Sequence, residues 1–104
     1  MPLKEIATNG TIALSLHADD MCDERGISRD DVEKTVRSFD MLEEYPNAFP
    51  HPAVLLYGES DDRPIHVVAA FDKKAGFVYV VTVYFPDTER FEQNFRVRRR
   101  KLEQ

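Results

Sequence analysis

Histidine, tyrosine and arginine side chains occur together in a combination that suits cleavage of RNA without a metal ion. The candidates for proton transfer are His66, Tyr84 and His17, and the candidates for binding phosphate or RNA are Arg25, Arg96 and Arg98. When the RNA 2′-hydroxyl attacks the adjacent phosphate, one group takes its proton, another protonates the leaving oxygen, and guanidinium donors stabilise the transition state. The first hypothesis is therefore a metal-independent endoribonuclease.

The same residues also have a purely structural interpretation. His66 and Tyr84 would then be half-buried residues of a sheet, and the arginines would be charges at its rim. Such residues are common, and no spacing among them is specific to a nuclease. The residues alone favour this structural interpretation over the catalytic one.

Other kinds of site have weaker support in the sequence. His17 and Cys22 lie five residues apart, which is not a recognisable spacing for zinc ligands, so no metal or other cofactor is expected. Nothing near Cys22 predicts a lowered thiol pKa, and a packed cysteine is the better interpretation. The four glycines form no phosphate-binding loop.

The segment 64–84 is predicted to be a central β-hairpin, because two runs rich in Val, Ile, Phe and Tyr flank a turn at 72–76. Pairing Phe71 with Phe77 places His66 opposite Thr82, with Tyr84 diagonal to it on the same face. The opposite face, which in this register includes Phe77 and Tyr79, is predicted to face the core. A slip of one residue would scatter the polar cluster.

The elements around this hairpin are predicted from apolar spacing and from capping residues. Helices are predicted at 15–25, where Ser15 can cap the start and Gly26 ends it, and at 29–38. Strands are predicted at 41–45 and 53–57, so that successive antiparallel strands form a meander. Three further stretches are less regular: 1–10 is predicted to be loose or a short edge element, 11–16 a short strand or the entry to a helix, and the segment with Phe91 and Phe95 a short C-terminal helix or tail.

Composition and charge limit the class of protein. The 104 residues, 42% hydrophobic and 32% charged, suit a single soluble domain over 1–104, and a cytoplasmic location is expected because one cysteine cannot form an internal disulfide. Neither a membrane span nor a secretory leader is expected. Residues 1–62 carry 5 basic and 14 acidic side chains, whereas residues 63–104 carry 9 and 5. A basic patch for RNA is therefore expected only from the second half.

The chain resembles the numbered domain-of-unknown-function family 4258 over about residues 11–99. The matching motifs, in chain order, are Ser-x-His-Ala at 15–18, Glu-Arg-Gly-Ile-Ser at 24–28, Glu-Tyr-Pro at 44–46, His-Val-Val at 66–68, Thr-Val-Tyr-x-Pro-Asp at 82–87 and Phe-Arg-x-Arg at 95–98. Thr82 and the six candidate site residues all fall within these motifs.

That family is similar to the RelE/ParE-like toxin superfamily, which implies an α+β fold with two N-terminal helices packed on a curved antiparallel sheet of about four strands. The resemblance also implies a bacterial toxin of a toxin–antitoxin pair, with an antitoxin protein, RNA or a second copy of the chain as partner. The second hypothesis is a non-catalytic protein-binding module of the same fold. It predicts an exposed apolar patch around Phe49, Leu56 and Phe91.

Overall fold

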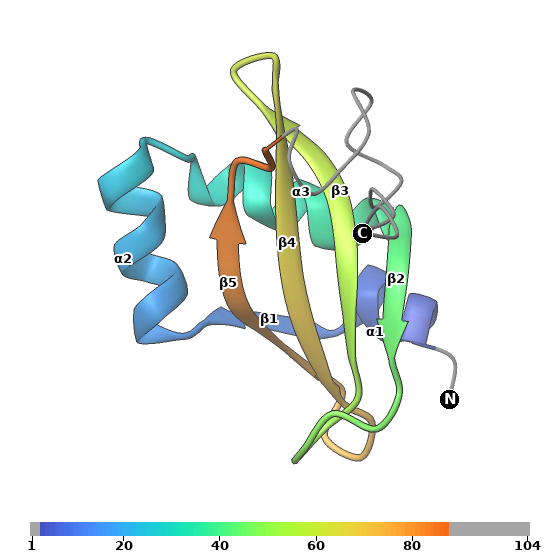
Figure 1. The fold of residues 1–104 in the computed structure, drawn as a ribbon. Coiled ribbons are helices and arrows are strands. Elements are labelled where there is room, and N and C mark those ends of the chain that lie inside the picture. The colour runs from blue at the N-terminus through green and yellow to red at the C-terminus, as the bar shows by residue number, and fades with distance from the viewer. Residues whose placement is uncertain (1–2, 88–104) are drawn as a thin grey trace, which may run out of the picture.

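The computed structural model describes residues 3–87, which form three helices and five strands (Figure 1). In chain order these are α1 (Leu3–Asn9), β1 (Thr11–Leu14), α2 (Leu16–Arg25), α3 (Arg29–Ser38), β2 (Met41–Tyr45), β3 (Ala53–Ser60), β4 (Arg63–Asp72) and β5 (Phe77–Tyr84). The α+β class and both predicted helices are confirmed. Ser15 and Ser28 cap α2 and α3, and Gly26 ends α2 in the left-handed conformation at φ 68°. The predicted C-terminal helix or tail lies outside the described residues.

The five strands form one mixed sheet in the order β1-β5-β4-β3-β2. The pairs β2–β3, β3–β4 and β4–β5 are antiparallel, so the predicted meander is confirmed. The prediction of an antiparallel sheet of about four strands is wrong in one respect, because β1 adds a fifth strand parallel to β5. Two parallel strands can pair only when a long segment of chain connects them, and here that segment runs from α2 to β4. Signals between neighbouring residues therefore do not reveal the pairing of β1 with β5.

The N-terminal residues form a helix that the sequence analysis did not predict. Ile6 and Ala7 of α1 are buried in the core. The guanidinium of Arg37 on α3 donates to the backbone oxygens of Ala7, Thr8 and Gly10 at 3.3, 3.1 and 2.8 Å. These carbonyls lie at the end of α1, where a helix leaves them without intrahelical partners. Tertiary contacts therefore support a helix too short to be stable alone.

The register of the hairpin differs from the predicted one at the turn and again at a β-bulge at Val81. Ala69 pairs with Val80 and Val68 pairs with Thr82, so Val81 is the extra residue in β5. Phe71 pairs with Val78 rather than with Phe77, and His66 pairs directly with Tyr84 rather than with Thr82. The predicted pairing was therefore wrong, although His66, Thr82 and Tyr84 still share one face.

The bulge also decides which residues of β5 face the core. Val78, Val80 and Val83 are fully buried on the helix side, whereas Phe77 and Tyr79, predicted to be core residues, lie on the other side. We call this other side the open face. On the central strands it carries Ala53, Leu55, Tyr57, His66, Val68, Ala70, Phe77, Tyr79, Thr82 and Tyr84. Leu55 and His66 are fully buried there.

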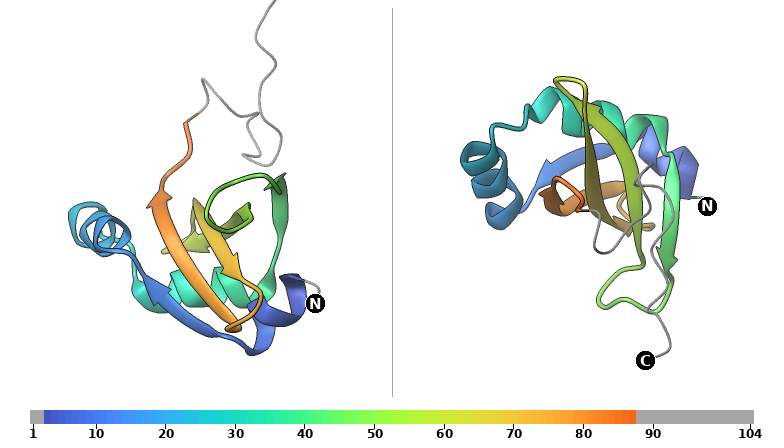
Figure 2. Two further views of the ribbon diagram at one scale, coloured as in Figure 1. Left: turned by 90° about the horizontal axis from the view of Figure 1, so that it is seen from below. Right: turned by 45° about the horizontal axis from the view of Figure 1, so that its top comes forward.

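The helices of residues 3–87 lie on one face of the sheet or at its edge. Figure 2 shows α3 and α1 on the side opposite the open face, with α2 beyond the edge of the sheet next to β5. The core between them consists of small and branched side chains, including Val32 and Val36 of α3 and Val54 and Val67 of the sheet. α3 approaches β3 closely at Gly58, where an added Cβ would lie 1.9 Å from the Thr35 hydroxyl. Glycine is therefore required at this crossing.

Candidate functional site

Three aromatic rings lie side by side on the open face, one from each of three neighbouring strands. His66 on β4 pairs with Tyr57 on β3 and with Tyr84 on β5. Its ring centroid lies 6.3 Å from that of Tyr57 and 5.5 Å from that of Tyr84, both in edge-to-face geometry. His66 is fully buried, at 0% exposure, whereas the two tyrosines are half-buried. The tyrosines therefore flank an imidazole that solvent does not reach.

Tyr57 is not among the predicted site residues, although the sequence contains a signal for its position. Asp61 and Asp62 both adopt positive φ angles, 52° and 63°, and form a two-residue turn that pairs Ser60 with Arg63. Asp tolerates the positive φ angles that such a turn requires. Counting back from this turn places Tyr57 opposite His66.

The N-terminus of α2 holds a second candidate histidine beside β5. His17 is exposed in the first turn of α2, and its Nε2 lies 3.1 Å from Oγ1 of Thr82. Ser15 fixes this approach, because its hydroxyl donates to the carbonyl of Val81 at 3.0 Å and accepts from the backbone N–H of Ala18. The bulged residue of β5 therefore anchors the helix that carries His17.

Replacing Ser15 with alanine should lower the free energy of unfolding by about 1–2 kcal/mol, because one helix cap and one bond to β5 are lost. Ser28→Ala is the matched control, since Ser28 caps α3 but makes no contact with β5 in the hydrogen bonds of the described chain. Urea denaturation should show a loss for both variants. Only Ser15→Ala should shift the NMR signals of the His17 ring, and equal shifts in both would contradict the anchoring role.

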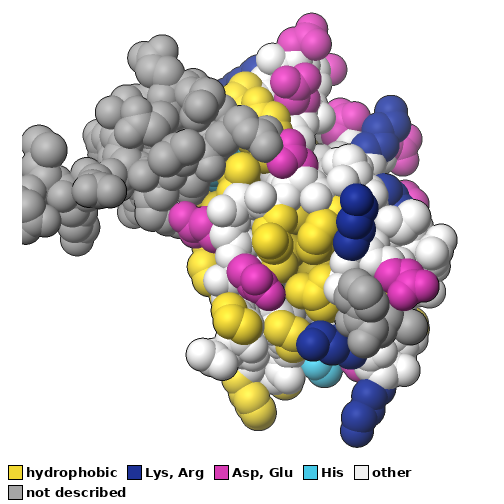
Figure 3. All heavy atoms as spheres, turned by 90° about the vertical axis from the view of Figure 1, so that its right-hand side faces the viewer, with side chains coloured by type: hydrophobic (Ala, Val, Ile, Leu, Met, Phe, Trp, Pro, Cys, Tyr) yellow, Lys and Arg dark blue, Asp and Glu magenta, His cyan; other side chains and the backbone are white. Residues whose placement is uncertain are grey.

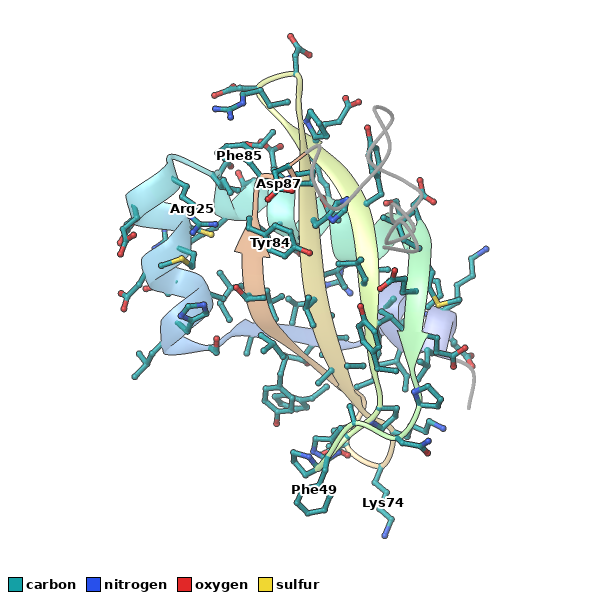
Figure 4. All side chains as sticks on the ribbon, viewed as in Figure 1. Arg25, Phe49, Lys74, Tyr84, Phe85 and Asp87 are labelled. Carbon is teal, nitrogen blue, oxygen red and sulfur yellow. The ribbon has the colours of Figure 1, made fainter. Side chains whose placement is uncertain are left out.

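Arginines border this end of the sheet. Arg25 is the last residue of α2 and is exposed, and its side chain points from the helix toward the end of β5 that carries Tyr84 (Figure 4). The guanidinium of Arg63 stacks over the ring of Phe85, with its central carbon 3.7 Å from the ring centroid. Arg96 and Arg98, the other predicted phosphate ligands, lie outside the described residues.

Acidic residues hold α2 in place without entering the site. Arg29 Nε donates to Asp19 Oδ1 at 2.6 Å, and Arg29 Nη2 donates to Asp23 Oδ1 at 3.1 Å. These hydrogen bonds raise the pKa of Arg29 and join α2 to the start of α3. On the inner side of α2, Cys22 is buried, and this desolvation raises the pKa of its thiol. Cys22 is therefore a packed residue and not a reactive thiolate.

The structure thus brings four of the six candidate site residues to one end of β5. His17 contacts Thr82, His66 contacts Tyr84, and Arg25 faces the same strand end. Thr82 and Tyr84 are two residues apart on one face, which links the two histidine contacts through a single strand. The exposed groups suit proton transfer and anion binding at the surface, while His66 is placed to orient a tyrosine.

Residues 3–87 contain no group of three His, Cys, Asp or Glu side chains arranged to hold a metal ion. In the same part of the chain, no helix has the length and apolar character needed to cross a membrane.

Comparison with known proteins gives one match. The model of the family described as "Domain of unknown function (DUF4258)" matches residues 14–85. The matched segment begins at the end of β1 and ends just after β5, so it contains α2, α3 and the strands that carry His66 and Thr82. No curated protein and no solved structure matches the chain.

Proposed function

The chain belongs to the DUF4258 family of unknown function, and we propose that it is a RelE-like toxin that cleaves RNA without a metal ion. The observation that carries this proposal is the contact between His17 and Thr82, next to Tyr84 and Arg25 at one strand end. An exposed imidazole, a phenol and a guanidinium are the groups that RNA transesterification uses. The resemblance of the family to RelE/ParE-like toxins supports the same reaction, and an antitoxin protein is the expected partner.

In the proposed reaction the 2′-oxygen attacks the adjacent phosphorus, and the bond from phosphorus to the 5′-oxygen breaks. One product ends in a 2′,3′-cyclic phosphate and the other begins with a 5′-hydroxyl. His17 takes the proton from the 2′-hydroxyl, and Tyr84 supplies a proton to the leaving 5′-oxygen. Arg25 stabilises the negative charge on the phosphate oxygens, because guanidinium groups form strong charge-assisted hydrogen bonds with phosphate.

His66 has a positioning role in this proposal. Its complete burial keeps it from touching a phosphodiester, but its ring packs against Tyr84. An edge-to-face contact restricts the tyrosine ring to one orientation. Substitution of His66 should therefore act on the reaction through Tyr84.

Induced expression in a bacterial host tests this function, with growth and transcript integrity followed over the first minutes. Growth arrest together with cleaved transcripts is the expected result, and the fragments should carry 5′-hydroxyl ends. Arg25→Ala should relieve both effects, while Lys34→Ala, which removes a charge from the exposed face of α3, serves as the control. Normal growth with intact transcripts, at a level of soluble protein confirmed by gel, would refute the nuclease.

A protein-binding scaffold is the alternative function, and the side chain of Phe49, 95% exposed, favours it. The predicted patch is wrong at Leu56, which is fully buried in the core, and Phe91 lies outside the described residues. This alternative predicts that expression of the wild-type protein leaves transcripts intact. It also predicts that Phe49→Ser abolishes the complex with the partner protein. Elution of the wild-type protein as a monomer without any bound partner would oppose it.

A further inference from the structure

A second set of rings lies on the open face at the opposite end of the sheet from Tyr84. Tyr79 on β5 stacks on Phe77, with centroids 5.8 Å apart and an interplanar angle of 27°. It also stacks on His51, with centroids 6.2 Å apart and an angle of 11°. We call these three residues the aromatic column. Tyr79 is 38% exposed, so the column reaches solvent.

The column exists because of the register of the hairpin and two small residues. Phe71 pairs with the inward-facing Val78, so the next residue, Tyr79, faces outward, and its cross-strand neighbours on the open face are Ala70 and then Ala53. Alanines leave room for the tyrosine ring to lean toward His51 across β4. A solvent-exposed stack of near-parallel rings adds little to the core, which lies on the other face of the sheet.

Positive charge lies beside the aromatic column. Lys73 and Lys74 are exposed in the turn before β5, and they line a surface pocket of about 510 Å³ together with His51 of the column and the acidic residues Glu44 and Asp72. Figure 4 shows Lys74 and Phe49 extending from this end of the sheet, and Figure 3 shows basic, histidine and hydrophobic side chains together there. Oδ1 of the nearby Asp72 accepts from the backbone N–H groups of Lys74 and Ala75, and its Oδ2 lies 3.8 Å from Nε2 of His51.

We propose that the aromatic column and the two lysines form a binding subsite for single-stranded RNA. Flat rings stack with any nucleobase, and lysines pair with the phosphates between bases, which is how single strands are bound without sequence preference. Tyr79 and Thr82 are three residues apart on β5, a separation of about 10 Å at the rise of a strand. One strand of RNA can therefore contact this subsite and the His17 end together.

This inference rests on the proposed function. RNA binding can be measured without RNA cleavage, so the binding subsite and the nuclease activity can be tested separately. The probe is a fluorescein-labelled single strand of about ten nucleotides, with 2′-O-methyl groups so that no 2′-hydroxyl is available for attack. Fluorescence anisotropy gives its dissociation constant. Tyr79→Ala should weaken binding by about 5- to 100-fold, the cost of losing one stacked base, while Tyr79→Phe keeps the ring and should bind like the wild type.

Matched variants separate stacking from charge. Met41→Ala removes an exposed apolar side chain from β2, outside the aromatic column, and should leave binding unchanged. The double variant Lys73→Ala and Lys74→Ala should reduce the slope of log affinity against log salt by about 1.4, the value for two phosphate contacts on a single strand. Lys34→Ala, on the exposed face of α3, should leave that slope unchanged.

Three outcomes would overturn the inference. Equal affinity of Tyr79→Ala and wild type would remove the aromatic column from RNA binding and leave the nuclease proposal standing. A change of oligomeric state in Tyr79→Ala, with unchanged RNA affinity, would identify this face as a protein interface. Failure of the wild-type protein to bind the probe at low salt would overturn both the subsite and the RNA-directed function.

Discussion

Replacing His17 with alanine should slow RNA cleavage by about 10²- to 10⁴-fold, the usual contribution of one general acid–base group. The imidazole is exposed and fixed beside Thr82, so its removal takes away a proton acceptor without opening the core. The rate is measured on a defined messenger RNA in a translation extract, which supplies ribosomes as well as free RNA. Thermal unfolding of the variant should match that of the wild type.

His17→Asn provides the control for this result. Its amide can still hydrogen-bond the Thr82 hydroxyl, but it has no group that takes up a proton near neutral pH. A nuclease in which His17 transfers the proton loses activity in both variants. If His17→Asn keeps wild-type activity, His17 only positions Thr82, and the assignment of the proton acceptor in the proposed mechanism is wrong.

The elements that were predicted correctly are those whose signals are local. Ser15, Ser28 and Gly26 mark helix ends by the hydrogen bonds and backbone angles that those positions require. The run of β-branched and aromatic residues in β5 suits a pleated strand in any register. These features depend on a few neighbouring residues, and the sequence displays them directly.

The features that were missed depend on contacts between distant segments. α1 is supported by Arg37, about 30 positions later in the chain, and β1 pairs with a strand more than 60 positions away. No residue type marks Val81 as the site of a bulge, since Val80, Val81 and Val83 are alike in composition. Packing on the helices selects which of these valines turn inward.

The candidate site was predicted as a set of residues but not as an arrangement. His66 and Tyr84 were placed on one face, and the structure brings their rings into contact. The complete burial of His66 was not predictable, because it depends on flanking strands as well as on its own. His17 was chosen from the family resemblance and its side-chain chemistry, and only the fold places it beside Thr82.

Replacing Phe71 with alanine should lower the free energy of unfolding by about 3–5 kcal/mol, the usual cost of truncating a buried phenylalanine. Phe71 is fully buried, and its ring meets that of Phe39 edge-to-face at a centroid distance of 6.0 Å. The loss is a large part of the 5–15 kcal/mol that is typical of a domain's stability, so the midpoint of urea denaturation should fall sharply.

Phe49→Ala is the matched control, because it makes the same chemical change on a side chain that is 95% exposed. It should change the free energy of unfolding by no more than about 0.5 kcal/mol. Similar losses in the two variants would mean that the core is not packed around Phe71.

Phe71 also pairs with Val78, between the turn of the hairpin and the bulge, so it helps to keep Val78 inward and Tyr79 outward. Leucine at this position is also apolar and faces inward, so a folded Phe71→Leu variant should retain the aromatic column. The packing of the core thereby sets the orientation of the rings on the surface proposed to bind RNA.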